Sequence, residues 1–86
     1  MVHETTTALP GPEVLARAKT FFADRVPHMS AFLEKEGPTF ATFRGQGGEE
    51  IALAVIAGDG GTRVRASTLL FDQPVARFLA TLPGVA

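Results

Sequence analysis

The segment from residue 49 to residue 70 constrains the fold more than any other part of this chain. Along residues 49–57 the larger side chains at 51, 53 and 55 point one way and those at 52, 54 and 56 the other, and along residues 62–70 Val64, Ala66, Thr68 and Leu70 alternate with Arg63, Arg65, Ser67 and Leu69. A period of two is typical of a β-strand, whose successive side chains point to opposite faces of the sheet. The Gly-Asp-Gly-Gly sequence at 58–61 between the two segments is typical of a tight hairpin turn. The segment therefore predicts an antiparallel hairpin with one buried face and one face at least partly in water.

Two shorter segments extend the predicted sheet. Residues 39–44 are rich in Thr and Phe, which are good strand formers. Residues 29–36 allow two interpretations: Ala, Leu, Glu and Lys favour a helix that stops at Gly37-Pro38, whereas a turn at 36–39 favours a hairpin with the next strand. We favour the strand, because the edge of 39–44 needs a partner and this segment is the nearest one.

A helix is expected on each side of these strands. Residues 12–26 start with Pro in the first turn, place apolar side chains on one face of a 3.6-residue period, and end before Pro27. Residues 73–82 follow Asp72, which is a suitable N-cap, and the segment carries apolar residues at i, i+3, i+4 and i+7. Pro83-Gly84 ends this second helix.

These elements predict an α+β domain in two layers, in the order α-β-β-β-β-α. The sheet has three or four antiparallel strands, because short turns join neighbours along the chain. Residues 1–10 are expected to form a flexible N-terminal tail, and residues 11–86 a single domain. The face expected against the helices comes from alternate positions of the two best strands: Ile51, Leu53 and Val55 on one, and Val64, Ala66, Thr68 and Leu70 on the other.

Composition excludes several classes of function. The 86-residue chain has no cysteine, which excludes thiol catalysis and Cys-based zinc sites. The chain has eight Lys and Arg and nine Asp and Glu, which gives a net charge of −1, and the basic residues are scattered along the sequence. Because nucleic-acid binding needs a basic patch, a nucleic-acid partner is not expected. The longest apolar run, 51–57, is too short to cross a bilayer. With no signal-peptide pattern at 1–9, we expect a cytoplasmic protein without a membrane partner.

The candidate motifs for chemistry are weak. The Gly-rich stretch at 44–50 leads into a strand and carries two glutamates, so a hairpin turn fits it better than a phosphate-binding loop. His3 lies in the predicted tail, and His28 follows a helix end without a placed nucleophile or acid. We therefore expect no cofactor, no metal and no catalytic residues, and an enzyme is only the third hypothesis.

One set of charged side chains could share a sheet face: Glu34, Glu36, Arg44, Arg63 and Arg65. The first interpretation is a set of cross-strand ion pairs on a solvated face. The second is that Arg63 and Arg65 bind an anionic or carboxylate ligand.

The first functional hypothesis is a non-enzymatic interaction module that acts as a homodimer. Two helices can cover only one face of the sheet, and the other face would carry Ala52, Ala54, Ile56, Leu69 and some of the phenylalanines. Such a face is too apolar for a monomer, and two copies could stack these faces or join sheet edges. The candidate residues for binding a ligand or partner are Arg44, Arg63, Arg65, Glu34, Ile56 and Leu69.

The alternative is a carrier or sensor of a small apolar ligand. Residues 61–71, which lead into the helix at 75–82, resemble the last strand and closing helix of helix-grip, START-like lipid-binding domains. The likeness covers about a quarter of the chain and carries over no functional residue. It implies a minimal pocket between the helices and the sheet.

Overall fold

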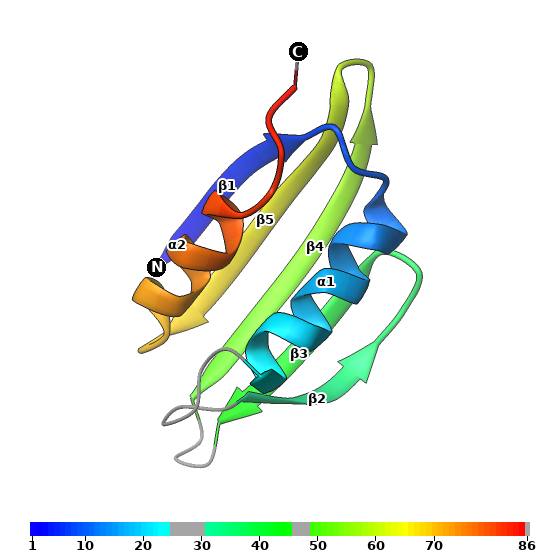
Figure 1. Ribbon diagram of the computed structural model, residues 1–86. Helices are drawn as coiled ribbons and strands as arrows, with labels where there is room; N and C mark the ends of the chain where they lie inside the picture. Colours follow the sequence, from blue (N-terminus) through cyan, green and yellow to red (C-terminus); the bar gives the residue numbers. More distant parts are fainter. Residues whose placement is uncertain (25–30, 46–48, 86) are drawn as a thin grey trace.

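The computed structural model describes residues 1–24, 31–45 and 49–85 and contains one sheet with two helices packed on it (Figure 1). The described elements, in chain order, are β1 (Val2–Thr7), α1 (Gly11–Asp24), β2 (Ala31–Glu36), β3 (Phe40–Gly45), β4 (Glu50–Gly58), β5 (Gly61–Leu69) and α2 (Asp72–Ala80). Both helices lie on the same face of the sheet, side by side. The predicted two-layer α+β class is confirmed.

The sheet has five strands in the order β1-β5-β4-β3-β2, and all neighbours are antiparallel. The strand β4 is central, and β1 and β2 form the two edges. The helix α1 packs over β2 and β4, and α2 packs over β1 and β5. The order of the elements is therefore β-α-β-β-β-β-α, and the sheet has five strands instead of the predicted three or four.

The missing strand is β1, in the segment expected to be a tail. Val2–Thr7 pairs with β5 in an unbroken register that runs from the Val2–Ser67 pair to the Thr7–Thr62 pair. Thr7 is fully buried, and its hydroxyl donates a hydrogen bond of 2.6 Å to the carbonyl oxygen of Pro83. Residues 2–7 therefore form an edge strand of the sheet, where a tail had been expected.

The predicted hairpin is confirmed. The strands β4 and β5 pair along their whole length, and Gly58 and Gly61 are Cα partners at the turn. Gly61 has φ +140°, and a Cβ built on it would lie 2.5 Å from the carbonyl oxygen of Thr7. Glycine is thus required here by both the backbone conformation and the approach of β1. The strand interpretation of 29–36 is confirmed for Ala31–Glu36, and residues 29–30 lie outside the described residues.

The junction between β5 and α2 differs from the prediction at two residues. Leu70 was expected on the buried face, but it has φ +76° and is 69% exposed, because the chain leaves the sheet there. Asp72 was expected to be the N-cap, but it lies in the first turn of α2. Phe71 occupies the cap position without a side-chain cap hydrogen bond. The first helix begins at Gly11, one residue before the predicted start, and its predicted end at residues 25–26 lies outside the described part of the chain. The second helix covers Asp72–Ala80 instead of 73–82.

A phenylalanine cluster fills the space between the helices and the sheet. Phe22 of α1 has its ring centroid 5.2 Å from that of Phe43 of β3 and 5.4 Å from that of Phe78 of α2. All three side chains are about 1% exposed. The predicted buried positions of β4 and β5 are confirmed apart from Leu70. Because both helices pack on this face of the sheet, no described segment covers the opposite face.

Candidate interaction surface

The sheet face opposite the helices is the candidate functional site, and we call it the open face. Its residues alternate with the buried ones along each strand, and Cα partners on neighbouring strands share a face. The open face consists of Val2, Glu4 and Thr6 of β1, Arg63, Arg65, Ser67 and Leu69 of β5, Glu50, Ala52, Ala54 and Ile56 of β4, Phe40, Thr42 and Arg44 of β3, and Phe32, Glu34 and Lys35 of β2.

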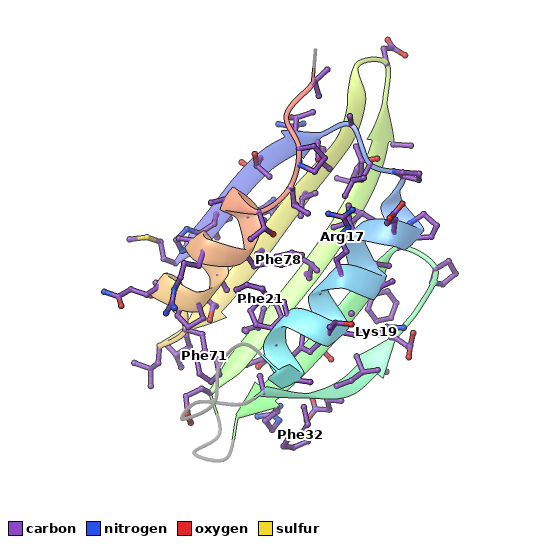
Figure 2. The ribbon with its side chains drawn as sticks, in the orientation of Figure 1. Arg17, Lys19, Phe21, Phe32, Phe71 and Phe78 are labelled. Carbon is purple, nitrogen blue, oxygen red and sulfur yellow. The ribbon has the colours of Figure 1, made fainter. Side chains whose placement is uncertain are left out.

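Large apolar side chains are distributed over all five strands of this face. Leu69 is 66% exposed, Phe32 56%, Ile56 55%, Val2 46% and Phe40 36%. Single exposed apolar residues are ordinary on a protein surface, whereas a contiguous apolar patch is typical of an interaction site. Figure 2 shows Phe32 at the end of the molecule where β2 begins, away from the Phe21 and Phe78 rings under the helices.

The open face is low around Ala52, because the side chains of Ala52 and of its neighbours Ser67 and Thr42 are small. Ala52 and Ala54 of β4 lie opposite Ser67 and Arg65 of β5. A shallow depression of about 190 Å³ lies beside Leu69 and is lined by Ala52 and Ser67 among others. A face with a low centre and raised apolar side chains at its flanks allows another flat surface to approach closely.

An ion-pair network lies across β2, β3 and β4 at one end of this face. Arg44 Nε and Nη2 donate hydrogen bonds to both carboxylate oxygens of Glu34, and Arg44 Nη2 lies 4.0 Å from Glu50 Oε2. The hydrogen bonds from Arg44 lower the pKa of Glu34, and the same bonds raise the pKa of Arg44. Because both side chains are exposed, we expect this pair to contribute little to stability and more to the orientation of the two groups.

Among the described residues, the two arginines of β5, Arg63 and Arg65, have fewer contacts with carboxylates than Arg44 has. Arg63 Nη2 lies 3.9 Å from Glu4 Oε1 across the pairing with β1. Within the described part of the chain, no carboxylate lies within ion-pair distance of Arg65. Arg63 and Arg65 are two residues apart on one strand and point to the same face, whereas Arg44 lies two strands away. The three arginines therefore do not form one anion-binding cluster.

All six predicted site residues lie on the open face, in separate places. Arg44 and Glu34 are bonded to each other, Ile56 is the Cα partner of Arg63, and Leu69 lies at the opposite end of β5, across from Glu50. The remaining charged candidate, Glu36, is on the other face.

A β-bulge explains the position of Glu36. The register between β2 and β3 shifts between Leu33 and Lys35, so Glu36 pairs with the buried Ala41. Its carboxylate accepts a hydrogen bond of 2.6 Å from Lys19 of α1, which ties this helix to the edge strand. Alternation alone had placed Glu34 and Glu36 on the same face, and an extra residue in the strand breaks that rule.

Three further residues of the open face were not singled out from the sequence. Val2 and Glu4 were missed because their segment was taken as a tail, although Thr-Thr-Thr at residues 5–7 is a β-branched signal for a strand. Glu50 was predicted to lie in the strand at 49–57 but was not considered as a partner of Arg44, beside which it lies in β4.

The helix side of the molecule carries a groove between α1 and α2. It has a volume of about 470 Å³ and is lined by Phe21 and Phe78 together with polar residues, among them Glu13 and Arg17. Figure 2 shows Phe21 and Phe78 meeting between the two helices, and their ring centroids are 5.4 Å apart. The predicted pocket between helices and sheet would need the space that Phe22 fills, so the groove is external.

The described residues offer little for catalysis or metal binding. His3 Nε2 lies 2.8 Å from Asp72 Oδ1, and this contact lowers the pKa of Asp72. His28 lies outside the described residues. In the parts of the chain that the structure places, no group of three His, Asp or Glu side chains could hold a metal ion, and neither helix is long and apolar enough to cross a membrane.

Comparison of this chain with protein-family models, with curated proteins and with solved structures finds no match.

Proposed function

We propose that this protein is a homodimeric interaction module whose two copies pack their open faces together. The observation that carries the proposal is the exposure of five large apolar side chains on one sheet face, from Val2 at one edge to Phe32 at the other. Burial of apolar surface is the main driving force for association. A second copy supplies a surface of the same shape and composition, as a two-fold interface requires.

The size of the open face supports the proposal. Five strands about 4.8 Å apart, with six to nine residues of about 3.3 Å each, span a patch on the order of 500–700 Å². Stable interfaces bury about 800 Å² of accessible surface per partner, and accessible surface exceeds the projected area. The open face is therefore large enough for a dimer of ordinary size.

The central position of β4 supports a particular arrangement. A two-fold axis along β4 sets this strand against its own copy, so that Ala52 and Ala54 meet their counterparts where the sheets come closest. Glu50 also meets its own copy in this arrangement, and the Arg44 beside each Glu50 offsets the repulsion between the two carboxylates. The same axis sets β5 against β3 of the partner. Arg65, which has no carboxylate partner among the described residues, then lies near the partner's Phe40, a contact that a cation–π interaction favours.

Charge substitutions at the two ends of the face test the proposal. Leu69→Glu and Ile56→Glu each place two carboxylates in the dimer interface, because the substitution occurs in both copies. We expect each to weaken dimerisation by tenfold or more, on the order of 1.4 kcal/mol. Ala76→Glu is the matched control, since Ala76 is exposed on α2, away from the open face. Dimers that persist in both sheet variants, measured by sedimentation, would rule the interface out.

A carrier of a small apolar ligand is the second candidate, supported by the groove between α1 and α2. The volume of this groove lies within the range of small-molecule sites. Its ligand would contact Phe21, with Arg17 and Glu13 at the rim. Native mass spectrometry of freshly purified protein tests this function: extra mass released on denaturation supports it, and a bare chain mass in every preparation counts against it.

A further inference from the structure

The two edges of the sheet differ in how well they are protected against another strand. The edge strand β2 has a bulge between Leu33 and Lys35, and residues 34–36 are all charged. Bulges and charges are ordinary devices that prevent strand addition. The edge strand β1 has neither device: its six pairs with β5 are in continuous register, and Glu4 is its only charged residue apart from the ring of His3.

The hydrogen bonds at the start of β1 show which backbone groups point outward. The amino group of Met1 donates to the carbonyl oxygen of Thr68, and the N–H of Thr68 donates to the carbonyl oxygen of Met1. In an antiparallel ladder such mutual pairs recur at every second residue. His3, Thr5 and Thr7 therefore bond to β5, and the N–H and C=O groups of Val2, Glu4 and Thr6 point away from the sheet.

These outward groups are available over residues 2–6. Among the described residues, no backbone or side-chain hydrogen bond reaches the N–H or C=O groups of Val2, Glu4 or Thr6. Beyond them the edge is closed, because the N–H of Ala8 donates to the carbonyl oxygen of Pro83. The available edge therefore has a defined length, which suits a short extended segment.

A second copy of this chain fits the β1 edge poorly. Antiparallel pairing centred on Glu4 sets this carboxylate directly opposite its own copy, which is unfavourable. A register shifted toward Thr6 brings Val2 opposite Ala8 of the partner copy, whose N–H is already used. A register shifted the other way leaves only Val2 and Glu4 in the ladder.

We propose that the outer edge of β1 is a docking site for an extended segment of another protein, which adds to the sheet as a further strand with a Lys or Arg opposite Glu4. Strand addition of this kind takes its affinity from main-chain hydrogen bonds and its specificity from alternate side chains. Glu4 is half exposed, and its contact with Arg63 is long at 3.9 Å, so its carboxylate can accept a hydrogen bond from the incoming cation. This site adjoins the dimer interface, because the side chains of Val2, Glu4 and Thr6 lie on the open face, but the strand pairing uses the outward backbone groups of β1 and does not depend on a dimer.

Two defined peptides probe the site on the full chain. The first is the capped heptapeptide Thr-Val-Thr-Lys-Thr-Val-Thr, and the second has Glu in place of Lys. At about millimolar peptide, amide hydrogen exchange followed by NMR should show new protection at Val2, Glu4 and Thr6 and unchanged protection at His3 and Thr5. The Glu peptide should bind about threefold or more weakly than the Lys peptide.

Two protein variants separate strand addition from other binding. Glu4→Lys should reverse the preference between the two peptides. Thr6→Pro removes an outward N–H without removing a bond to β5, and proline is tolerated at such edge positions; we expect roughly tenfold weaker binding of the Lys peptide. Thr6→Ala is the matched control, because it keeps this N–H and should bind like the unmodified chain.

Three results would overturn the proposal: no added protection at the three outward amides, equal binding by Thr6→Pro and Thr6→Ala, or an unchanged peptide preference in Glu4→Lys. The mass in solution, measured for each variant, reports on the open-face dimer independently. A dimer with an inert β1 edge refutes only the strand-addition proposal, and peptide binding by a monomer refutes only the dimer.

Discussion

His3 Nε2 of β1 lies 2.8 Å from Asp72 Oδ1 at the start of α2, although the two residues are 69 positions apart in the chain. The histidine ring is on the helix side of the edge strand, and Asp72 is in the first turn, where a negative charge also suits the helix dipole. This contact joins the first strand to the last helix.

The contact predicts an acid-dependent loss of stability. Since hydrogen bonding from His3 lowers the pKa of Asp72, the unfolded state binds more protons than the folded state near and below about pH 4. The stabilisation is present above the unfolded pKa and is lost as the pH falls through the lower folded pKa. Denaturant midpoints measured from about pH 2 to pH 6 should fall less steeply for Asp72→Asn than for the unmodified chain. The same dependence of the denaturant midpoint on pH in both proteins would contradict a role for Asp72 in this loss of stability.

The phenylalanine cluster predicts a strong contrast between two Phe→Ala substitutions. Phe22 is 1% exposed and packs against Phe21, Phe43 and Phe78 in edge-on and tilted ring contacts, so Phe22→Ala should lower the free energy of unfolding by about 3–5 kcal/mol. Phe32 is 56% exposed, and Phe32→Ala should change the free energy of unfolding by less than about 1 kcal/mol. Both are measured by denaturant unfolding, at concentrations low enough to dissociate a dimer. Similar losses for the two variants would refute this description of the core.

The β4–β5 turn predicts opposite effects for two neighbouring glycines. A Cβ at Gly61 meets the Thr7 carbonyl oxygen at 2.5 Å, and its φ of +140° is strained for other residues. Gly61→Ala should therefore destabilise the chain by more than about 1 kcal/mol. At Gly60 a Cβ meets nothing within 4 Å, so Gly60→Ala should be neutral or stabilising by up to about 1 kcal/mol. The thermal unfolding midpoints of both variants check this prediction. A decrease in the midpoint of Gly60→Ala equal to that of Gly61→Ala would contradict it.

The elements predicted from sequence are those with local signals. The Gly-Asp-Gly-Gly turn and the alternation beside it identify β4 and β5, and the 3.6-residue periods identify both helices. The strand β1 was missed because its helix-side positions, His3, Thr5 and Thr7, are polar. Its strand state depends on pairing with β5, some sixty residues away, and no local pattern encodes such a partner.

The open face was predictable only where a local alternation pattern identifies the strand. Ile56, Leu69 and the arginines lie on strands whose alternation is regular, and their common face follows from it. Glu36 was misplaced because a bulge is not visible in alternation, and Leu70 because the strand ends one residue earlier than its apolar pattern does. Val2 and Glu4 lie on the open face because β1 pairs with β5, and they were missed because that strand was not predicted.

The mass of the unmodified protein in solution tests the central claim most directly. Sedimentation velocity over a wide range of concentrations should give twice the chain mass of 9.1 kDa, with dissociation only on dilution. Leu69→Glu should dissociate to the single-chain mass at concentrations tenfold or more above those at which the unmodified protein dissociates, with unchanged circular dichroism. A single-chain mass for the unmodified protein up to about millimolar concentration would contradict the account, since the five apolar side chains of the open face would then remain in water.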